Sequence, residues 1–339
     1  MSLELPTVSI IVWGYHQGSN YLPATIKSIL QQTYEEFEVL LVQDSYPQIL
    51  SWFEEQIDPR LRFFSANNLS LAEVLNQGIS AAQGQYISFM IAGDLWHPQK
   101  LEQQILCLTD HPEISLIHSA SLLIGHQGQD IGKIVSPIKE GLRPPEILAQ
   151  NQLSLSSVMM RRNCFELVGL FNPQLPTIPD WELWIRLSHL SNHGQFMAIA
   201  EPLVYCRQIR EASPKYWLTL ETDLHSMIEI AYANLPPERS QHKHRSYGYA
   251  SLFLAQNVLQ HKNPDLAIAH NYCYQALEHD PCLLFSLEFC QLRWRIWYLH
   301  WRLFLQRSDR FHRLQRLIQD GENREKALLH KTKELSQMN

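Results

Sequence analysis

Three aspartates stand beside apolar runs, at positions where a carboxylate can take part in chemistry. Asp44 follows the run 37–42 (FEVLLV), Asp94 follows the run 86–90 (YISFM), and Asp180 begins a helix-like segment. A carboxylate can accept an N–H hydrogen bond, bind a hard cation or take a proton from a hydroxyl. Aspartate also closes turns after strands and caps helices, where a cap contributes about 1 kcal/mol. Both kinds of role are therefore open for each of the three.

The chain around these aspartates alternates strand-like and helix-like segments. The strand-like segments are 8–13, 37–42, 61–64, 86–90 and 114–119, and the helix-like segments are 21–31, 70–82 and 98–108. We expect Asn20 to cap the first of these helices. Such alternation predicts parallel strands joined by right-handed crossovers, and hence an α/β domain. In these sheets ligands collect at the carboxyl ends of the strands, so the residues that follow each strand are candidates for binding.

The last third of the chain has a helical pattern, and a boundary is expected at 212/213. We therefore predict an α/β domain over 5–212 and an all-α domain over 213–339. Within the latter, 247–281 has the small-residue and terminal-proline spacing of one tetratricopeptide-like hairpin. A stable solenoid needs about three such units, so an isolated helical hairpin packed on the α/β domain is an equal alternative.

The C-terminal end is basic although the chain as a whole carries a net charge of -6. From Gln291 onward there are eleven Lys/Arg and five Asp/Glu, a local balance of +6. Over 291–317 the arginines are interleaved with Trp, Tyr, Phe and Leu. Such a helix can lie in a membrane interface with its arginines on anionic head groups, or pack on the protein with its arginines reaching solvent. We expect a peripheral membrane or protein contact here.

The composition is that of a folded chain, with 45% hydrophobic and 18% charged residues. An acidic chain without a recognition motif predicts no nucleic-acid binding. The sequence has no basic leader and no apolar run of bilayer length, which is about 18 residues. The six cysteines show no CxxC spacing and have apolar neighbours, so we expect buried, reduced thiols. Together these features predict a cytoplasmic protein, or one bound peripherally to the inner membrane face.

Five blocks between Val8 and Arg207 resemble the inverting family 2 glycosyltransferases, which are nucleotide-sugar enzymes of the GT-A type fold. The blocks are WGYHQG, SILQQTY, FEVLLVQDS, AAQGQYISFMIAGDLWHPQKLE and PDWELWIRL. Five blocks in the family's order are far more specific than any single motif. The resemblance implies a Rossmann-like mixed sheet flanked by helices. It also implies transfer of a hexose-type sugar from a nucleotide-diphosphate donor to an acceptor hydroxyl with inversion, in polysaccharide, glycolipid or cell-envelope glycan synthesis.

On the donor side, the resemblance places Tyr15, Asp44 and Asn68 at nucleotide-binding positions. Asp44 falls at the position that recognises the base, and a carboxylate can accept the imide or amino N–H of a base. Arg207 can pair with phosphate bidentately, with an intramolecular ion pair as the alternative. Asp94 falls in the diphosphate region.

On the acceptor side, the resemblance places a general base at Asp180. In an inverting transfer the acceptor hydroxyl attacks the anomeric carbon from the face opposite the nucleotide, and a carboxylate must take its proton. Trp181, the next residue, falls where an aromatic ring can offer a sugar-stacking face. The acceptor is expected to be a glycan or a lipid-linked molecule.

The metal motif departs from the family pattern. The block Phe-Leu-Asp-x-Asp-Asp-Leu-Trp stands here as FMIAGDLW over 89–96, so Ile91 and Gly93 replace two aspartates and Asp94 alone is kept. Mg2+ or Mn2+ can still be held by Asp94 together with diphosphate oxygens and water. The loss makes a catalytically inactive relative, kept for binding or as a scaffold, the alternative function. A helical-repeat adaptor is a third class.

Overall fold

The computed structural model describes the chain in ten segments and divides it into two compact units. The segments are 6–14, 20–43, 58–65, 69–134, 151, 153–190, 195–207, 214–233, 243–260 and 264–302. The units are Met1–Ala250 and Ser251–Asn339. Tyr15, Asp44 and Asn68 lie outside the described residues, as does the basic region beyond 302.

The described residues of the first unit form one mixed nine-stranded sheet. Its strands are β1 (Val8–Gly14), β2 (Phe37–Gln43), β3 (Leu61–Ser65), β4 (Tyr86–Ile91), β5 (Leu95–Trp96), β6 (Ile114–Ile124), β7 (Asp130–Ile134), β8 (Met159–Arg161) and β9 (Gln195–Arg207). Their order is β3-β2-β1-β4-β8-β6-β9-β5, with β7 paired to β6. Strands β3, β2, β1 and β4 are parallel, and the antiparallel β8 separates them from the parallel pair β6 and β9. This mixed sheet confirms the predicted α/β class.

The four parallel strands end at one edge of the sheet, called here the carboxyl edge. Gly14 of β1 lies opposite Gln43 of β2, and Gln43 lies opposite Ser65 of β3. On the other side, Trp13 lies opposite Ile91, the last residue of β4. Apolar, β-branched residues form these strands because both faces of the sheet are covered. The chain positions that follow them are those that the sequence predicted to bind a ligand.

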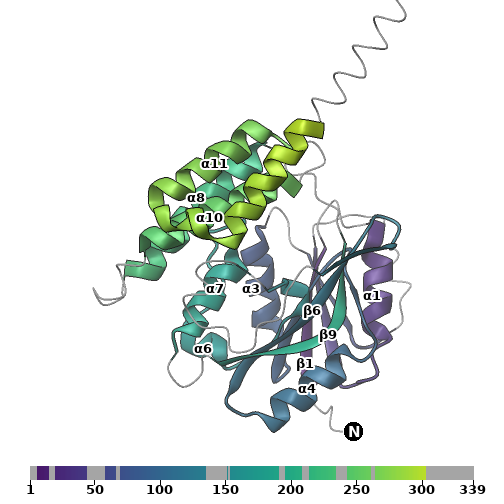
Figure 1. The fold of residues 1–339 in the computed structure, drawn as a ribbon. Helices are drawn as coiled ribbons and strands as arrows, with labels where there is room; N and C mark the ends of the chain where they lie inside the picture. The colour runs from purple at the N-terminus through teal and green to yellow at the C-terminus, as the bar shows by residue number, and fades with distance from the viewer. Residues whose placement is uncertain are drawn as a thin grey trace, which may run out of the picture. The chain divides into compact units, whose positions relative to one another are not determined.

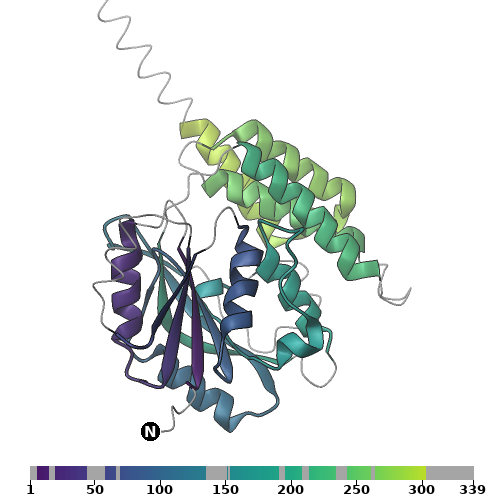
Figure 2. The same ribbon diagram turned by 180° about the vertical axis from the view of Figure 1, so that it is seen from behind.

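Helices cover both faces of the sheet (Figures 1 and 2). They are α1 (Leu22–Leu30), α3 (Leu71–Ala81), α4 (Lys100–Asp110), α6 (Cys164–Val168) and α7 (Pro179–Ser188). Helices α1 and α4 share one buried cluster with β1, β2 and β4, to which Ile26 and Leu101 contribute. Helix α3 lies on the other face, where a Cβ on Gly78 would meet Ile11 Cγ2 at 2.5 Å. The N-cap of α1 is Tyr21, without a side-chain cap bond, so the predicted Asn20 cap is wrong.

The remaining helices follow the sheet in the chain. They are α8 (Pro214–Ala233), α10 (Lys243–Gln260), α11 (Leu266–His279), the 3-10 helix η3 (Pro281–Phe285) and the helix at 287–302. The first unit includes α8, since Asp223 accepts hydrogen bonds from Thr177 N (2.9 Å) and Thr177 Oγ1 (2.5 Å). The compact unit thus ends later than 212/213, and a separate domain over 5–212 stays a prediction. The tetratricopeptide-like hairpin over 247–281 also stays a prediction.

The structure bears on the expectations about membrane-spanning segments and about cysteines. Within the described segments, no helix has the length and apolarity that a bilayer crossing requires. All six cysteines are free thiols. Cys164 and Cys273 are buried as expected, but Cys282 and Cys290 are exposed, so the expectation of buried thiols is wrong for these two.

His118 on β6 predicts a loss of stability in acid. Burial lowers the pKa of His118 from 6.5 to about 4, although the Ser119 backbone partly opposes this. The unfolded chain then binds a proton that the folded chain does not, so stability is complete above pH 6.5 and falls as the pH decreases toward 4. The loss by pH 4 is about 3 kcal/mol. We expect His118→Leu to abolish that part of the pH dependence in urea titrations at pH 8 and pH 4, and exposed His111→Gln to keep it. Equal acid sensitivity of His118→Leu and the unmodified protein would contradict this assignment.

Candidate active site

Asp94 lies in a tight turn just past the carboxyl edge. The residue is buried, with 7% of its surface exposed. Oδ2 accepts a hydrogen bond from Ser156 Oγ at 2.6 Å, and Oδ1 accepts one from the Arg207 backbone N–H at 2.9 Å. These partners come from 62 and 113 positions away in the chain. Asp94 therefore joins the end of β4 to the segment before β8 and to the end of β9.

The turn around Asp94 is held by its backbone as well. Gly93 has φ +112°, a conformation that residues with a Cβ rarely adopt. Its N–H donates to Thr25 Oγ1 at 3.0 Å, and the same hydroxyl donates to the Asp94 carbonyl at 2.9 Å. This geometry gives a physical reason for glycine where the family pattern has an aspartate.

The Arg207 guanidinium is engaged within the protein. Its Nε donates to the Gly93 carbonyl, and one terminal nitrogen donates to the carbonyls of Gly125 and His126, each at 2.8 Å. The guanidinium carbon also lies 4.5 Å from the centre of the Tyr21 ring. These contacts are to backbone carbonyls and a ring, so they are not the ion pair given as the alternative, and they fix the turn between β6 and β7 against the Asp94 turn. A phosphate contact of Arg207 stays a prediction.

The described residues do not fit a cation held by a pair of carboxylates. Ile91 and Gly93 have no side-chain oxygen, so Asp94 is the one carboxylate that this motif offers. Among the residues that the structure describes, no group of three or more His, Cys, Asp or Glu side chains could hold a metal ion. A resident divalent cation is therefore not part of the site derived below.

Asp180 lies in the first turn of α7, which begins at Pro179. The N-cap of this helix is Ile178, so the alternative in which Asp180 acts as the N-cap is wrong. Its side chain is half-buried, and Oδ2 accepts a hydrogen bond from Asn151 Nδ2 at 3.2 Å. The positive end of the helix dipole favours a negative charge at this place. Asp180 is thus held as a partly accessible carboxylate.

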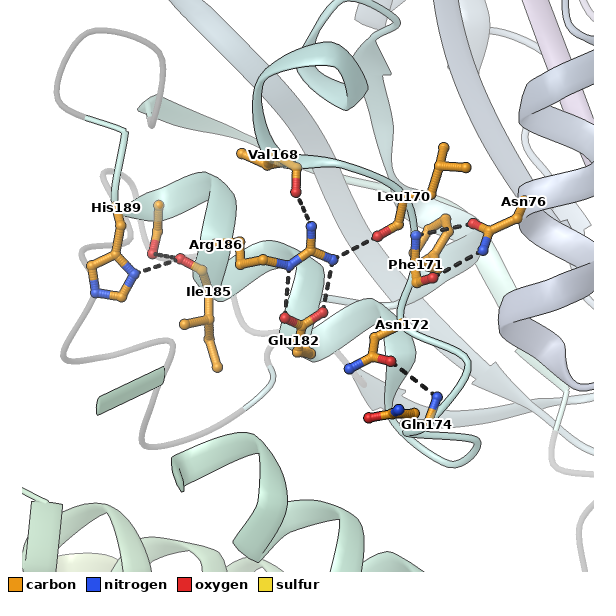
Figure 3. Close-up of polar contacts among 11 residues, drawn as sticks. Asn76, Val168, Leu170, Phe171, Asn172, Gln174, Glu182, Ile185, Arg186 and His189 are labelled. Carbon is orange, nitrogen blue, oxygen red and sulfur yellow. Dashed lines mark hydrogen bonds and ion pairs between the residues drawn. The ribbon is translucent and has the colours of Figure 1, made fainter. Parts of the chain in front are cut away.

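A set of polar contacts fixes α7 in place (Figure 3). Glu182 and Arg186 form a bidentate ion pair, with Nε–Oε1 at 2.6 Å and Nη2–Oε2 at 2.7 Å. Arg186 also donates to the carbonyls of Val168, the last residue of α6, and of Leu170 just after it. Because Glu182 and Arg186 belong to the same helix as Asp180, these bonds hold the element that carries the candidate base.

The chain before α7 is fastened to α3. Asn76 donates to the Phe171 carbonyl at 2.9 Å and accepts from the Phe171 N–H at 3.0 Å (Figure 3). The Phe171 ring packs edge-on against Trp184 of α7 and against Phe89 of β4. Trp181 is also part of this interior, at 1% exposure. The described structure thus gives Trp181 no open face for sugar stacking, unlike the sequence prediction.

A short segment connects the two described aspartates. Asn151 holds Asp180, and five positions later Ser156 holds Asp94. Five residues span at most about 18 Å between their Cα atoms, and the 3-10 turn over Leu155–Ser157 shortens that further. Asp94 and Asp180 are therefore both held by residues of one short segment, although 86 positions separate their numbers. Sequence reasoning missed Asn151, Ser156 and Thr25, for which the serine run SLSS at 154–157 is the sole local signal.

The chain is similar in sequence to known glycosyltransferases. Residues 9–122 match the family described as Glycosyl transferase family 2. An uncharacterized glycosyltransferase of Rickettsia felis is 28% identical over 208 residues, covering 55% of this chain and 32% of that protein. One from Rickettsia conorii is 30% identical over 201 residues, covering 53% and 31%. One from Methanocaldococcus jannaschii is 26% identical, covering 60% and 72%. The match therefore spans about a third of the Rickettsia relatives.

Solved structures give the fold. Staphylococcus aureus TarS 1–349 in complex with UDP-GlcNAc has a TM-score of 0.55 at 16% identity, covering 86% of this chain and 88% of that one. The mannosyltransferase PcManGT from Pyrobaculum calidifontis, in complex with GDP-Man and Mn2+, has a TM-score of 0.53 at 16% identity, covering 88% and 86%. The protein thus has the fold of GT-A glycosyltransferases, and residues 9–122 match the Glycosyl transferase family 2 model.

Proposed function

We propose that this protein transfers a hexose-type sugar from a nucleotide-diphosphate donor to an acceptor hydroxyl with inversion. The observation that supports the proposal is that Asn151 and Ser156, five positions apart, hold the half-buried carboxylate of Asp180 and the Asp94 carboxylate just past the carboxyl edge. An inverting transfer requires a carboxylate beside the donor, and in such a sheet a donor binds at the carboxyl edge.

The donor would bind along the carboxyl edge. Tyr15 follows β1, Asp44 follows β2 and Asn68 comes after β3, so their places in the chain suit a nucleotide ligand. Two proteins of similar fold were solved with UDP-GlcNAc and with GDP-Man, which supports a nucleotide sugar as the donor class.

The transfer would occur in a single displacement. Asp180 accepts the proton of the acceptor hydroxyl, and the hydroxyl oxygen forms a bond to the anomeric carbon. The bond from that carbon to the diphosphate oxygen breaks on the opposite face, and the nucleoside diphosphate leaves with the electron pair. Since Asp94 and Arg207 are engaged in holding turns, we assign them to shaping the donor edge rather than to direct contact with the diphosphate. A glycan or lipid-linked molecule on the cytoplasmic side remains our proposed acceptor.

A catalytically inactive binding or scaffold protein is the second candidate. The observation that favours it is the replacement of two metal-motif aspartates by Ile91 and Gly93. Such a protein would bind nucleotide sugars without turning them over.

A panel of nucleotide diphosphates and their sugars, tested with and without Mn2+, separates the two candidates. We expect binding of at least one nucleotide diphosphate, with Mn2+ changing Kd by less than about tenfold, because Asp94 alone offers a carboxylate in this motif. Slow hydrolysis or transfer of the matching donor supports the enzyme, whereas binding without turnover supports the scaffold. Absence of binding across the panel contradicts both. A strict, stoichiometric requirement for Mn2+ would mean that residues outside the motif supply further ligands.

A further inference from the structure

The helix at 287–302 in the second unit has two apolar faces. One face is buried and consists of Phe289, Leu292 and Ile296. Their spacing of three and four residues is that of one side of an α-helix. A helix that only packed on its own unit would carry polar residues on the remaining side.

The opposite side is aromatic. It consists of Leu287, Trp294, Trp297, Tyr298 and Trp301, called here the aromatic face. Trp294 and Trp297 are 63% and 62% exposed, and Trp301 is 48% exposed. The rings are ordered against one another, since Trp294 stacks on Tyr298 at 5.6 Å and Trp297 on Trp301 at 6.4 Å, with interplanar angles of 10° and 8°. So much contiguous exposed aromatic surface marks an interaction site.

Arginines flank the aromatic face. By helical position, Arg293 lies on one side of it, and Arg295 and Arg302 lie on the other. Arg293 contacts His270 Nε2 at 2.7 Å and Arg295 donates to the Leu259 carbonyl at 3.2 Å, so both side chains are oriented. Within the described segments, none of the three arginines is ion-paired with a carboxylate. Their positive charge is therefore available to a partner.

We propose that the aromatic face binds the surface of an anionic lipid bilayer, with the helix lying in the plane of the interface. Indole and phenol rings favour the headgroup region, and arginine side chains reach lipid phosphates from its edge. The basic balance of +6 from Gln291 onward, on a chain whose other residues carry a balance of -12, would orient the protein with this end toward a negative surface. This inference does not depend on the proposed sugar transfer.

Charge decides between a membrane and a second copy of the chain. A two-fold interface brings the same patch of both copies together, so the flanking arginines of one copy would face those of the other. Like charges opposed at close range cost energy, whereas anionic phosphates pair with them. The observations therefore favour lipid over self-association.

Vesicle flotation of the full chain tests the proposal. We expect binding to phosphatidylcholine vesicles that contain about 30 mol% phosphatidylglycerol, and at least about tenfold weaker partitioning to pure phosphatidylcholine or at about 0.5 M NaCl. The triple variant Trp294→Gln, Trp297→Gln, Trp301→Gln should lose at least about tenfold in partitioning, because these side chains supply the inserted area. The control Tyr274→Gln alters an aromatic that is 62% exposed on α11 and should bind as the unmodified protein does.

Circular dichroism checks that the triple variant is folded. Because the replaced side chains are exposed, its helix content should equal that of the unmodified protein. A blue shift of tryptophan emission on binding, lost in the triple variant, is a second readout of insertion. The proposal is overturned if the protein ignores anionic vesicles, or if the triple variant binds them equally well. It is also overturned if the triple variant alters only the oligomeric state, which would assign the face to a second copy.

Discussion

Asp180→Asn is expected to lower the rate of sugar transfer by about 10²–10⁴-fold, the usual contribution of a positioned general base. The amide has nearly the shape of the carboxylate but cannot take the proton of the acceptor hydroxyl. Its oxygen can still accept the bond from Asn151, so the first turn of α7 should keep its place. Donor affinity should change little, since the base acts on the acceptor.

Three measurements on the same variant separate catalysis from structure. The rate of transfer should fall, the Kd for the donor should stay within about twofold, and the Tm should stay within about 2 °C. The acidic limb of the pH-rate profile, which reports the base, should disappear. The control Glu166→Gln changes an exposed carboxylate on α6 and should leave all of them unaltered. Loss of donor binding together with a lower Tm would instead identify Asp180 as a structural residue.

The sheet could be predicted from the sequence because its strands are locally distinct. The runs at 8–13, 37–42 and 86–90 are apolar, bounded by polar or glycine residues, and observed within about one residue of those bounds. Parallel pairing follows from the helices between them, and it brings the strand ends to one edge. The edge of the sheet at which Asp94 lies could therefore be predicted from the sequence.

The contacts that build the site could not be predicted from the sequence, because they join distant parts of the chain. Strand β8 is three residues long and pairs with β4 and β6, which no local pattern indicates. The hydrogen-bond donors to Asp94 are Ser156 and Arg207, which are likewise far from it in the sequence. Composition predicts that a buried carboxylate needs donors, but not which residues supply them.

The sequence also could not predict which side chains of α7 are exposed. The helix is buried almost all round, so its periodicity does not distinguish an open aromatic face from a core one, and Trp181 proves to be interior. Helix starts were misjudged for a related reason. Tyr21 and Ile178 occupy the N-cap positions without side-chain cap bonds, because proline in the first turn and tertiary packing fix these helices.

Asp94→Ala is expected to destabilise the first unit by about 3–5 kcal/mol. Removal of the carboxylate leaves the Ser156 hydroxyl and the Arg207 N–H without their acceptor in a buried place, and each lost bond to a charged group contributes about 1.5–3 kcal/mol. The control Asp110→Ala, at the exposed C-terminal end of α4, should change stability by less than about 0.5 kcal/mol. Urea titration of the full chain measures both.

Asp94→Asn then separates hydrogen bonding from metal binding. Its amide oxygen can still accept the Arg207 N–H, and its NH2 group can donate to the Ser156 hydroxyl, which keeps one lone pair for this reversal beside the one that accepts the Ile91 N–H. We therefore expect Asp94→Asn to recover more than half of the stability lost in Asp94→Ala, without a change in the small effect of Mn2+ on nucleotide binding. Gly93→Asp is no substitute for this test, because the φ of +112° would strain any side chain placed there. If Asp94→Ala proves as stable as Asp110→Ala and instead abolishes a Mn2+ effect, then Asp94 is a ligand and its hydrogen bonds are incidental.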